Sequence, residues 1–216
     1  KLPVAEAIEN SMDFITDTFS SGFKFFQNSG EMMMDSVTDF LVFIPPVVFI
    51  LLVAVLAFFV TGKKWSLALF SLIGLFFIYN QGLWNELMNT FTLVLFSSIL
   101  AIFLGIPIGI LMSKSKTAEQ IIKPILDFMQ TMPGFVYLIP AVAFFGIGVV
   151  PGVFASIIFA LPPTVRFTNL GIRQVPKELV EAADSYGSTP SQKLFKVELP
   201  LAKSTIMAGI NQTVLL

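Results

Sequence analysis

The feature that most constrains this chain is an unbroken run without a charged residue from Leu41 to Val60. A helix of about 20 residues rises roughly 30 Å, the thickness of the hydrocarbon core of a bilayer, so the run predicts a membrane-spanning helix. Its Pro45 and Pro46 lie near the start, where a missing N–H removes little helical hydrogen bonding. Only 12% of the residues are charged and 55% are hydrophobic, whereas soluble domains carry about 25% charged residues. We therefore expect an all-α integral membrane protein surrounded by a lipid bilayer.

Further apolar segments predict a polytopic helix bundle over residues 41–216. The spans that we expect are residues 41–60, 65–83, 87–112, 133–150, 152–165 and 201–216. Trp65 and Trp84, near the two ends of the second span, fit the aromatic belts of a membrane interface. The last segment is still apolar at Leu216, so we expect it to be the incomplete beginning of a span.

The basic residues lie in alternate loops between these spans. Lys and Arg in short loops favour the cytoplasm. One side holds Lys63, Lys64, Lys114, Lys116, Lys123, Arg166, Arg173, Lys177, Lys193, Lys196 and Lys203, and the other holds Lys1 and Lys24. We therefore expect the N-terminus outside the cytoplasm and a long cytoplasmic loop over residues 166–200.

Residues 1–40 predict an amphipathic helix on the outer surface. An apolar face at three- and four-residue spacing lies opposite a polar face. The apolar face is Ile8, Met12, Ile15, Phe19, Gly22 and Phe26, and the polar face is Glu6, Asn10, Asp13, Asp17, Ser20 and Lys24. Because its acidic residues oppose attraction to anionic lipid, we expect an extracytoplasmic scaffold or partner surface, with a plain interfacial anchor as the alternative.

Residue types that the chain lacks exclude several kinds of chemistry. The sequence has no Cys and no His, which excludes disulfides, thiol nucleophiles, a His general base and His or Cys metal sites. The first five spans contain no Asp, Glu or Lys, which disfavours ion-coupled transport, and no segment matches G-x-x-x-x-G-K-[ST]. We expect no catalytic residue, metal or cofactor in this chain and no nucleic-acid partner; any ATP would be hydrolysed by another subunit.

Glycine and proline are frequent inside the predicted spans. Examples are Gly105-Ile106-Pro107-Ile108-Gly109, Met132-Pro133-Gly134, Ile139-Pro140, Gly146-Ile147-Gly148 and Leu161-Pro162-Pro163. Broken helices at membrane depth line protein or a water-filled cavity, where the freed backbone groups find partners. The pattern favours a solute pathway, and the alternative is the ordinary abundance of both residues in membrane helices.

The loop over residues 166–200 is the most informative segment. Pro176 is expected at the first position of a short helix that ends at Gly187 in a left-handed conformation. Thr189-Pro190-Ser191-Gln192 is typical of a capping box that begins a second helix, which we expect to stop before Pro200. Outside this loop, we expect Asp127 to cap a helix or to pair with Lys123.

The same loop resembles the signature of binding-protein-dependent ABC importer permeases, E-A-A-x3-G-x9-I-x-L-P. The matching residues are Glu181, Ala182, Ala183, Gly187, Val197, Leu199 and Pro200, with Val197 in place of the usual Ile. In that family this element couples the permease to the ATPase. The resemblance therefore implies a type I ABC importer permease fold, in a bacterial cytoplasmic membrane, with these residues docked on cytoplasmic ABC ATPase subunits that bind ATP and Mg²⁺.

A narrower resemblance covers nearly all of residues 90–216. Pro124 to Pro133, Phe135 to Pro140, Phe159 to Pro163 and Leu199 to Ala202 resemble the glycine betaine/proline (quaternary amine) osmoprotectant permeases. This implies uptake of glycine betaine or related solutes, a second permease copy in a homodimer, and a substrate-binding protein or a fused binding domain beyond residue 216. Three alternatives stay open: the same importer architecture for another amine or amino acid, an ATP-independent secondary carrier or channel, and a membrane anchor for signalling partners that transports no solute.

The candidate translocation path is Met132 to Ile147 together with the facing third and fifth spans. A quaternary ammonium is attracted to aromatic faces by roughly 0.5–2 kcal/mol, so aromatic residues there are possible transient contacts. The candidate residues are Met132, Pro133, Gly134, Phe135, Tyr137, Pro140 and Phe144. Ordinary packing of the rings is the alternative for each.

Overall fold

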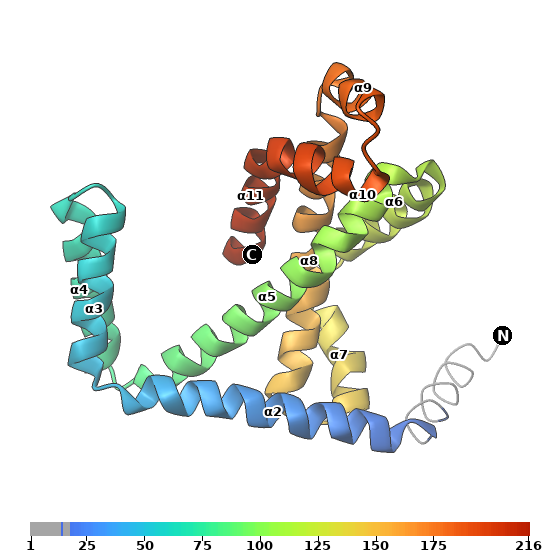
Figure 1. Cartoon of the computed structure of the whole chain (residues 1–216). Coiled ribbons are helices and arrows are strands. Elements are labelled where there is room, and N and C mark those ends of the chain that lie inside the picture. Colours follow the sequence, from blue (N-terminus) through green and yellow to red (C-terminus); the bar gives the residue numbers. More distant parts are fainter. Residues whose placement is uncertain (1–13, 15–17) are drawn as a thin grey trace. The chain divides into compact units, whose positions relative to one another are not determined.

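The computed structural model describes Phe14 and residues 18–216, and all regular elements within these residues are helices (Figure 1). They are α2 (Ser20–Phe43), α3 (Pro46–Val60), α4 (Trp65–Asn80), α5 (Trp84–Lys114), α6 (Lys116–Thr131), α7 (Gly134–Phe145), α8 (Val149–Arg173), α9 (Lys177–Ser185), α10 (Pro190–Lys193), the π-helical turn η1 (Leu194–Glu198) and α11 (Leu199–Leu215). The all-α prediction is confirmed for these residues. Most of the expected N-terminal amphipathic face, from Glu6 to Asp13, lies outside them.

The chain forms two compact units. Lys24–Leu93 makes one unit, and Val94–Leu216 makes the other together with the described residues up to Phe23. In the first unit, α3 and α4 are antiparallel neighbours, and Ile50 of α3 forms a core cluster with Trp84 and Met88 at the start of α5. Trp84 meets the rings of Phe49 and Tyr79 edge to face, at centroid distances of 5.6 and 6.0 Å.

Two of the expected spans are interrupted by breaks. The segment expected as residues 41–60 breaks at Pro45, where α2 and α3 meet at 91°, because two adjacent prolines withhold two backbone N–H donors. The segment expected as residues 133–150 is helical only in α7, which ends at Gly146 with a φ of 78°. A helix of 12 residues rises about 18 Å, so α7 can cross a bilayer only together with α6, which meets it at 99° across Met132 and Pro133.

Two helices are long and apolar enough to cross a membrane by themselves, among the residues described. They are α5 with 31 residues and α8 with 25. The expected fifth span, residues 152–165, is the middle of α8, which runs on to Arg173. The two bent pairs α2–α3 and α6–α7 qualify only if each pair is one span, and α4 is a shorter apolar helix.

Several of the expected helix breaks are instead places where helices approach closely. Pro107 lies inside α5, and Pro162 and Pro163 lie inside α8. A Cβ on Gly109 would lie 2.5 Å from Cβ of Thr168 and 2.7 Å from the carbonyl oxygen of Val165. Glycine is therefore required here so that α5 can touch α8, as is usual where membrane helices cross.

Candidate functional site: the helices between α8 and α11

The segment after α8 begins with a short helix that is closed at its C-terminal end. Pro176 was expected as the first helical residue of α9, but it is the N-cap, and the helix begins one position later, at Lys177. The N–H of Gly187 donates to the carbonyl of Asp184 at 2.9 Å, and the N–H of Ser188 donates to the carbonyl of Ala183 at 3.1 Å. These two bonds form a Schellman motif, which requires a left-handed residue. Gly187 has a φ of 76°, which confirms the expected helix end.

The capping box at Thr189 is also confirmed. The N–H of Gln192 donates to Oγ1 of Thr189 at 3.3 Å, and the N–H of Thr189 donates to Oε1 of Gln192 at 3.0 Å. Each side chain thus satisfies a backbone donor that the first turn of α10 leaves free.

The expected stop before Pro200 is wrong, because the chain stays helical from α10 through η1 into α11. Pro200 lacks the N–H of an α-helical bond, and its ring would clash with the carbonyl four residues earlier. The widened turn η1 accommodates it: the N–H of Leu199 donates to the carbonyl of Leu194, five residues back. Proline is compatible with the first turn of a helix, so Pro200 is accommodated in the first turn of α11 and does not end the helical segment.

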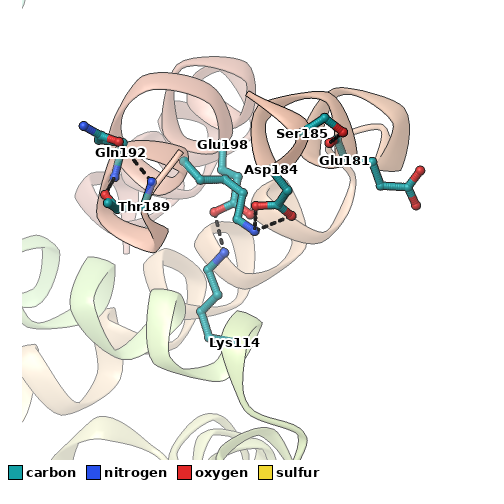
Figure 2. Close-up of polar contacts among 8 residues, drawn as sticks. Lys114, Glu181, Asp184, Ser185, Thr189, Gln192 and Glu198 are labelled. Atoms are coloured by element: carbon teal, nitrogen blue, oxygen red, sulfur yellow. Dashed lines mark hydrogen bonds and ion pairs between the residues drawn. The ribbon is translucent and has the colours of Figure 1, made fainter. Parts of the chain in front are cut away.

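Two ion pairs hold these short helices in place (Figure 2). Nζ of Lys193 in α10 contacts both carboxylate oxygens of Asp184 in α9, at 2.7 and 2.8 Å. Nζ of Lys114, the last residue of α5, contacts Oε2 of Glu198 at the end of η1. The first pair joins α9 to α10, and the second joins the whole segment to α5.

The residues of the ABC importer signature occupy different environments. Glu181 and Ala182 are exposed, and the Glu181 carboxylate points away from both ion pairs (Figure 2). Ala183 is buried, while Val197 and Leu199 are half-buried. Leu199 and Pro200 line a pocket of about 280 Å³ with Phe195, Lys203, Ile206 and Met207. α9 therefore presents Glu181 and Ala182 outward and keeps Ala183 for packing.

Arg173 joins the end of α8 to α5 and α6 through hydrogen bonds and an ion pair. Its guanidinium donates to the carbonyl of Met112 at 2.9 Å and to the side chain of Asn169 at 2.9 Å, and it contacts Oε2 of Glu119 at 2.8 Å. A cation at the last carbonyls of α5 is favourable because the C-terminal end of a helix carries partial negative charge.

The expected partner of Asp127 was Lys123, but the structure pairs Asp127 with Arg166 of α8, at 2.5 Å. The helix spacing of four residues allows the local pair. Arg166 reaches Asp127 from α8, which contacts α6.

The candidate path residues lie along the turn between α6 and α7 and along α7 itself. Met132 and Pro133 form the 99° bend, and Gly134 begins α7. The hydroxyl of Tyr137 donates to the carbonyl of Met129 at 3.1 Å, and the ring of Phe144 stacks on Phe23 at 5.3 Å. Phe135 is 70% exposed, whereas Pro140 is half-buried inside α7. Tyr137 and Phe144 thus already have packing partners, and their part in a solute path stays a prediction.

Lys114 and Glu198 are functional candidates that the signature does not contain. Their contact joins residues 84 positions apart, which no local pattern predicts. One signal was present: Leu194, Glu198, Ala202 and Ile206 recur every four residues, so Glu198 interrupts an otherwise apolar face. A carboxylate on a buried face predicts a cationic partner, but not which one.

Residues 101–215, from within α5 to the end of α11, match the family described as the inner membrane component of binding-protein-dependent transport systems. The match covers more than half of the chain, so the chain belongs to this family of membrane transport subunits.

Three relatives cover the whole of this chain or nearly so. The glycine betaine/carnitine transport permease protein GbuB of Listeria monocytogenes is 55% identical over all of this chain and 77% of its own length. The glycine betaine transport system permease protein OpuAB of Bacillus subtilis is 48% identical, over all of this chain and 76% of its own. The glycine betaine/proline betaine permease protein ProW of Escherichia coli is 42% identical over 215 residues, which are 60% of its length.

Proposed function

We propose that this chain is the membrane-spanning subunit of an ATP-driven importer of glycine betaine or related compatible solutes. The observation that carries the proposal is the 55% identity over the full chain to a permease named for glycine betaine and carnitine, with further betaine permeases at 48% and 42%. The permease has no ATPase site of its own. ATP and Mg²⁺ are bound by cytoplasmic ABC ATPase subunits.

The element formed by α9, Gly187 and α10 is the proposed docking site for the ATPase. Three features support it: an outward Glu181 carboxylate, a small exposed Ala182 beside it, and Tyr186 with 90% of its surface exposed. The Schellman motif, the capping box and the Lys193–Asp184 pair make the element stiff enough to move as one body. Val197, Leu199 and Pro200 carry its motion into α11, because η1 and α11 form one continuous helix.

The surrounding assembly has three further parts. A second copy of the permease completes the solute path, and an extracytoplasmic substrate-binding protein or fused binding domain delivers the solute. The N-terminus faces outward, with residues 1–40 as an extracytoplasmic scaffold. The basic residues support this orientation, since Lys177, Lys193, Lys196 and Lys203 all lie in the proposed docking element or in the helical segment that follows it.

The solute path is proposed along α7 and the bend before it, at Met132, Pro133, Gly134, Phe135, Tyr137, Pro140 and Phe144. The exposed ring of Phe135 supports a transient aromatic contact for a quaternary ammonium group. Tight binding there would slow release, so solute selection belongs mainly to the binding protein.

Uptake of labelled glycine betaine into proteoliposomes tests the proposal. The full-length permease is reconstituted with its ATPase and binding protein, with and without ATP on the ATPase side. We expect uptake only with ATP and only with the binding protein. ATP-dependent uptake of another amine or amino acid, without uptake of glycine betaine, would show that the proposed substrate is wrong. Uptake without nucleotide would refute the ATP-driven importer in favour of a secondary carrier or channel.

A further inference from the structure

Glu198 is the carboxylate with the least exposure among the ion pairs of the described residues. Its side chain is 6% exposed, compared with 54% for Asp127, 30% for Glu119 and 52% for Asp184. An ionised carboxylate is seldom kept away from water unless a cation compensates it. The Lys114 ammonium supplies this compensation, since its Nζ donates to Oε2 of Glu198. Glu198 thus depends on one residue of another helix.

The two partners lie at the ends of two different helical elements, Lys114 at the end of α5 and Glu198 at the end of η1. Glu198 ends η1, directly after the stiff α9–α10 element, and Figure 2 shows Lys114 reaching up to it from the end of α5. The Lys114 ammonium also lies in the last turn of α5, where partial negative charge of the helix end favours a cation. The ion pair therefore fastens the C-terminal end of α5 to the turn that follows the proposed docking element.

Apolar packing alone would hold α5 here less specifically. Ile106 and Ile110 of α5 pack against the cluster of Ile172, Ala202 and Ile206 on α8 and α11. Contacts of this kind are non-directional and allow helices to slide over each other by small distances. An ion pair between a buried carboxylate and a helix end fixes one point, because separating the charges leaves the carboxylate buried without compensation.

We propose that the Lys114–Glu198 ion pair is the link by which movement of the α9–α10 element displaces the end of α5. The inference rests on the proposed function, in which the ATPase moves that element. Lys114 and Glu198 are positioning residues: they touch neither nucleotide nor solute. They convert a movement of the loop into a movement of a membrane-spanning helix. Loss of the pair should therefore lower solute uptake more than it lowers ATP hydrolysis.

The test measures ATP hydrolysis and glycine betaine uptake in the same proteoliposomes, with the full-length permease, its ATPase and its binding protein. Glu198→Gln and Lys114→Met each remove one charge, and Lys114→Glu with Glu198→Lys exchanges the two. We expect hydrolysis within about twofold of wild type in each single variant and uptake per ATP reduced about tenfold, because the remaining charge loses its partner. The exchanged pair should recover part of the lost uptake per ATP, since it restores the attraction but places a carboxylate at the negative end of α5. Asp127→Asn, which removes one partner of an exposed pair in the same unit, should leave the ratio unchanged.

Several outcomes would overturn the inference. One is an unchanged ratio of uptake to hydrolysis in both single variants; another is a parallel fall of both activities, which would indicate a role in assembly alone. If Glu198→Gln does not accumulate in the membrane, Lys114→Met decides, since the Lys114 side chain is 41% exposed and its loss disturbs packing less. If the wild-type complex hydrolyses ATP but takes up no glycine betaine, the proposed substrate is refuted. If the wild-type complex takes up glycine betaine and both single variants keep its ratio of uptake to hydrolysis, only this inference is refuted.

Discussion

Gly187 combines a left-handed backbone with open space around it. Its φ is 76°, and a Cβ built there would meet nothing within 4 Å. A substitution is therefore penalised by backbone strain and not by a clash. The left-handed conformation costs an ordinary L-residue about 1–2 kcal/mol, whereas Asn adopts it more readily.

We expect Gly187→Val to lower ATP-dependent uptake severalfold and Gly187→Asn to stay near wild type. Uptake rates at equal amounts of membrane-inserted protein measure the effect. Gly74→Val is the matched control, because Gly74 also has open space around it but lies inside α4 without a positive φ. Equal activity of the Val and Asn variants at position 187 would contradict the role of the left-handed turn.

Gly109 is the opposite case, in which space and not backbone conformation demands glycine. Its Cβ would lie 2.5 Å from Cβ of Thr168 and 2.7 Å from a backbone oxygen, neither of which can rotate away. Overpacking of this kind costs about 1–3 kcal/mol. We therefore expect Gly109→Ala to lower the Tm of the detergent-solubilised permease by several degrees and Gly74→Ala to leave it nearly unchanged. A Gly109→Ala variant with wild-type Tm would show that α5 can shift away from α8 without cost.

At the scale of elements, what could be predicted from the sequence depended on how far each contact reaches along the chain. The helix end at Gly187 and the capping box at Thr189 were predicted because their hydrogen bonds span three to five residues. The continuation of the helix through Pro200 was not, since it depends on the widened turn η1. The prolines also differ in whether they interrupt a helix. Pro133 lies at a bend between two helices, while Pro107 and Pro163 lie inside continuous helices. Membrane helices tolerate interior prolines where neighbouring groups satisfy the freed carbonyls, and a sequence does not reveal those neighbours.

The start of α10 offers a direct test of the stiffness of the docking element. Thr189→Ala removes the acceptor for the Gln192 N–H, and loss of such a cap costs about 1 kcal/mol. We expect about fivefold faster hydrogen exchange in the peptide that covers Gln192, in line with a free-energy change of that size. Thr189→Ser keeps the hydroxyl and should exchange like wild type. Equal protection in the Ala and Ser variants would mean that the Lys193–Asp184 pair alone holds α10.

At the scale of the whole molecule, the lack of cysteine makes the proposed orientation directly measurable. With no Cys in the sequence, a single introduced thiol is the only labelling site in this chain. Gln81, Lys64 and Lys177 are exposed positions that the loop charges assign to different sides: Gln81 outside, and Lys64 and Lys177 in the cytoplasm. We expect a membrane-impermeant maleimide to label Gln81→Cys in intact cells, and to label Lys64→Cys and Lys177→Cys only after permeabilisation.

The three labelling positions test separate parts of the orientation argument. Lys64 reports the loop between α3 and α4, and Lys177 reports the start of α9, so the two are 113 positions apart in the chain. Labelling of Lys177→Cys in intact cells would put the proposed docking element on the side without ATP and would refute the coupling role of α9. Labelling of Lys64→Cys alone would instead mean that the loop between α3 and α4 lies on the outer side although α9 lies on the cytoplasmic side. Because basic loops are retained in the cytoplasm by their charge, adding lysines near Gln81 should weaken the labelling of Gln81→Cys in intact cells.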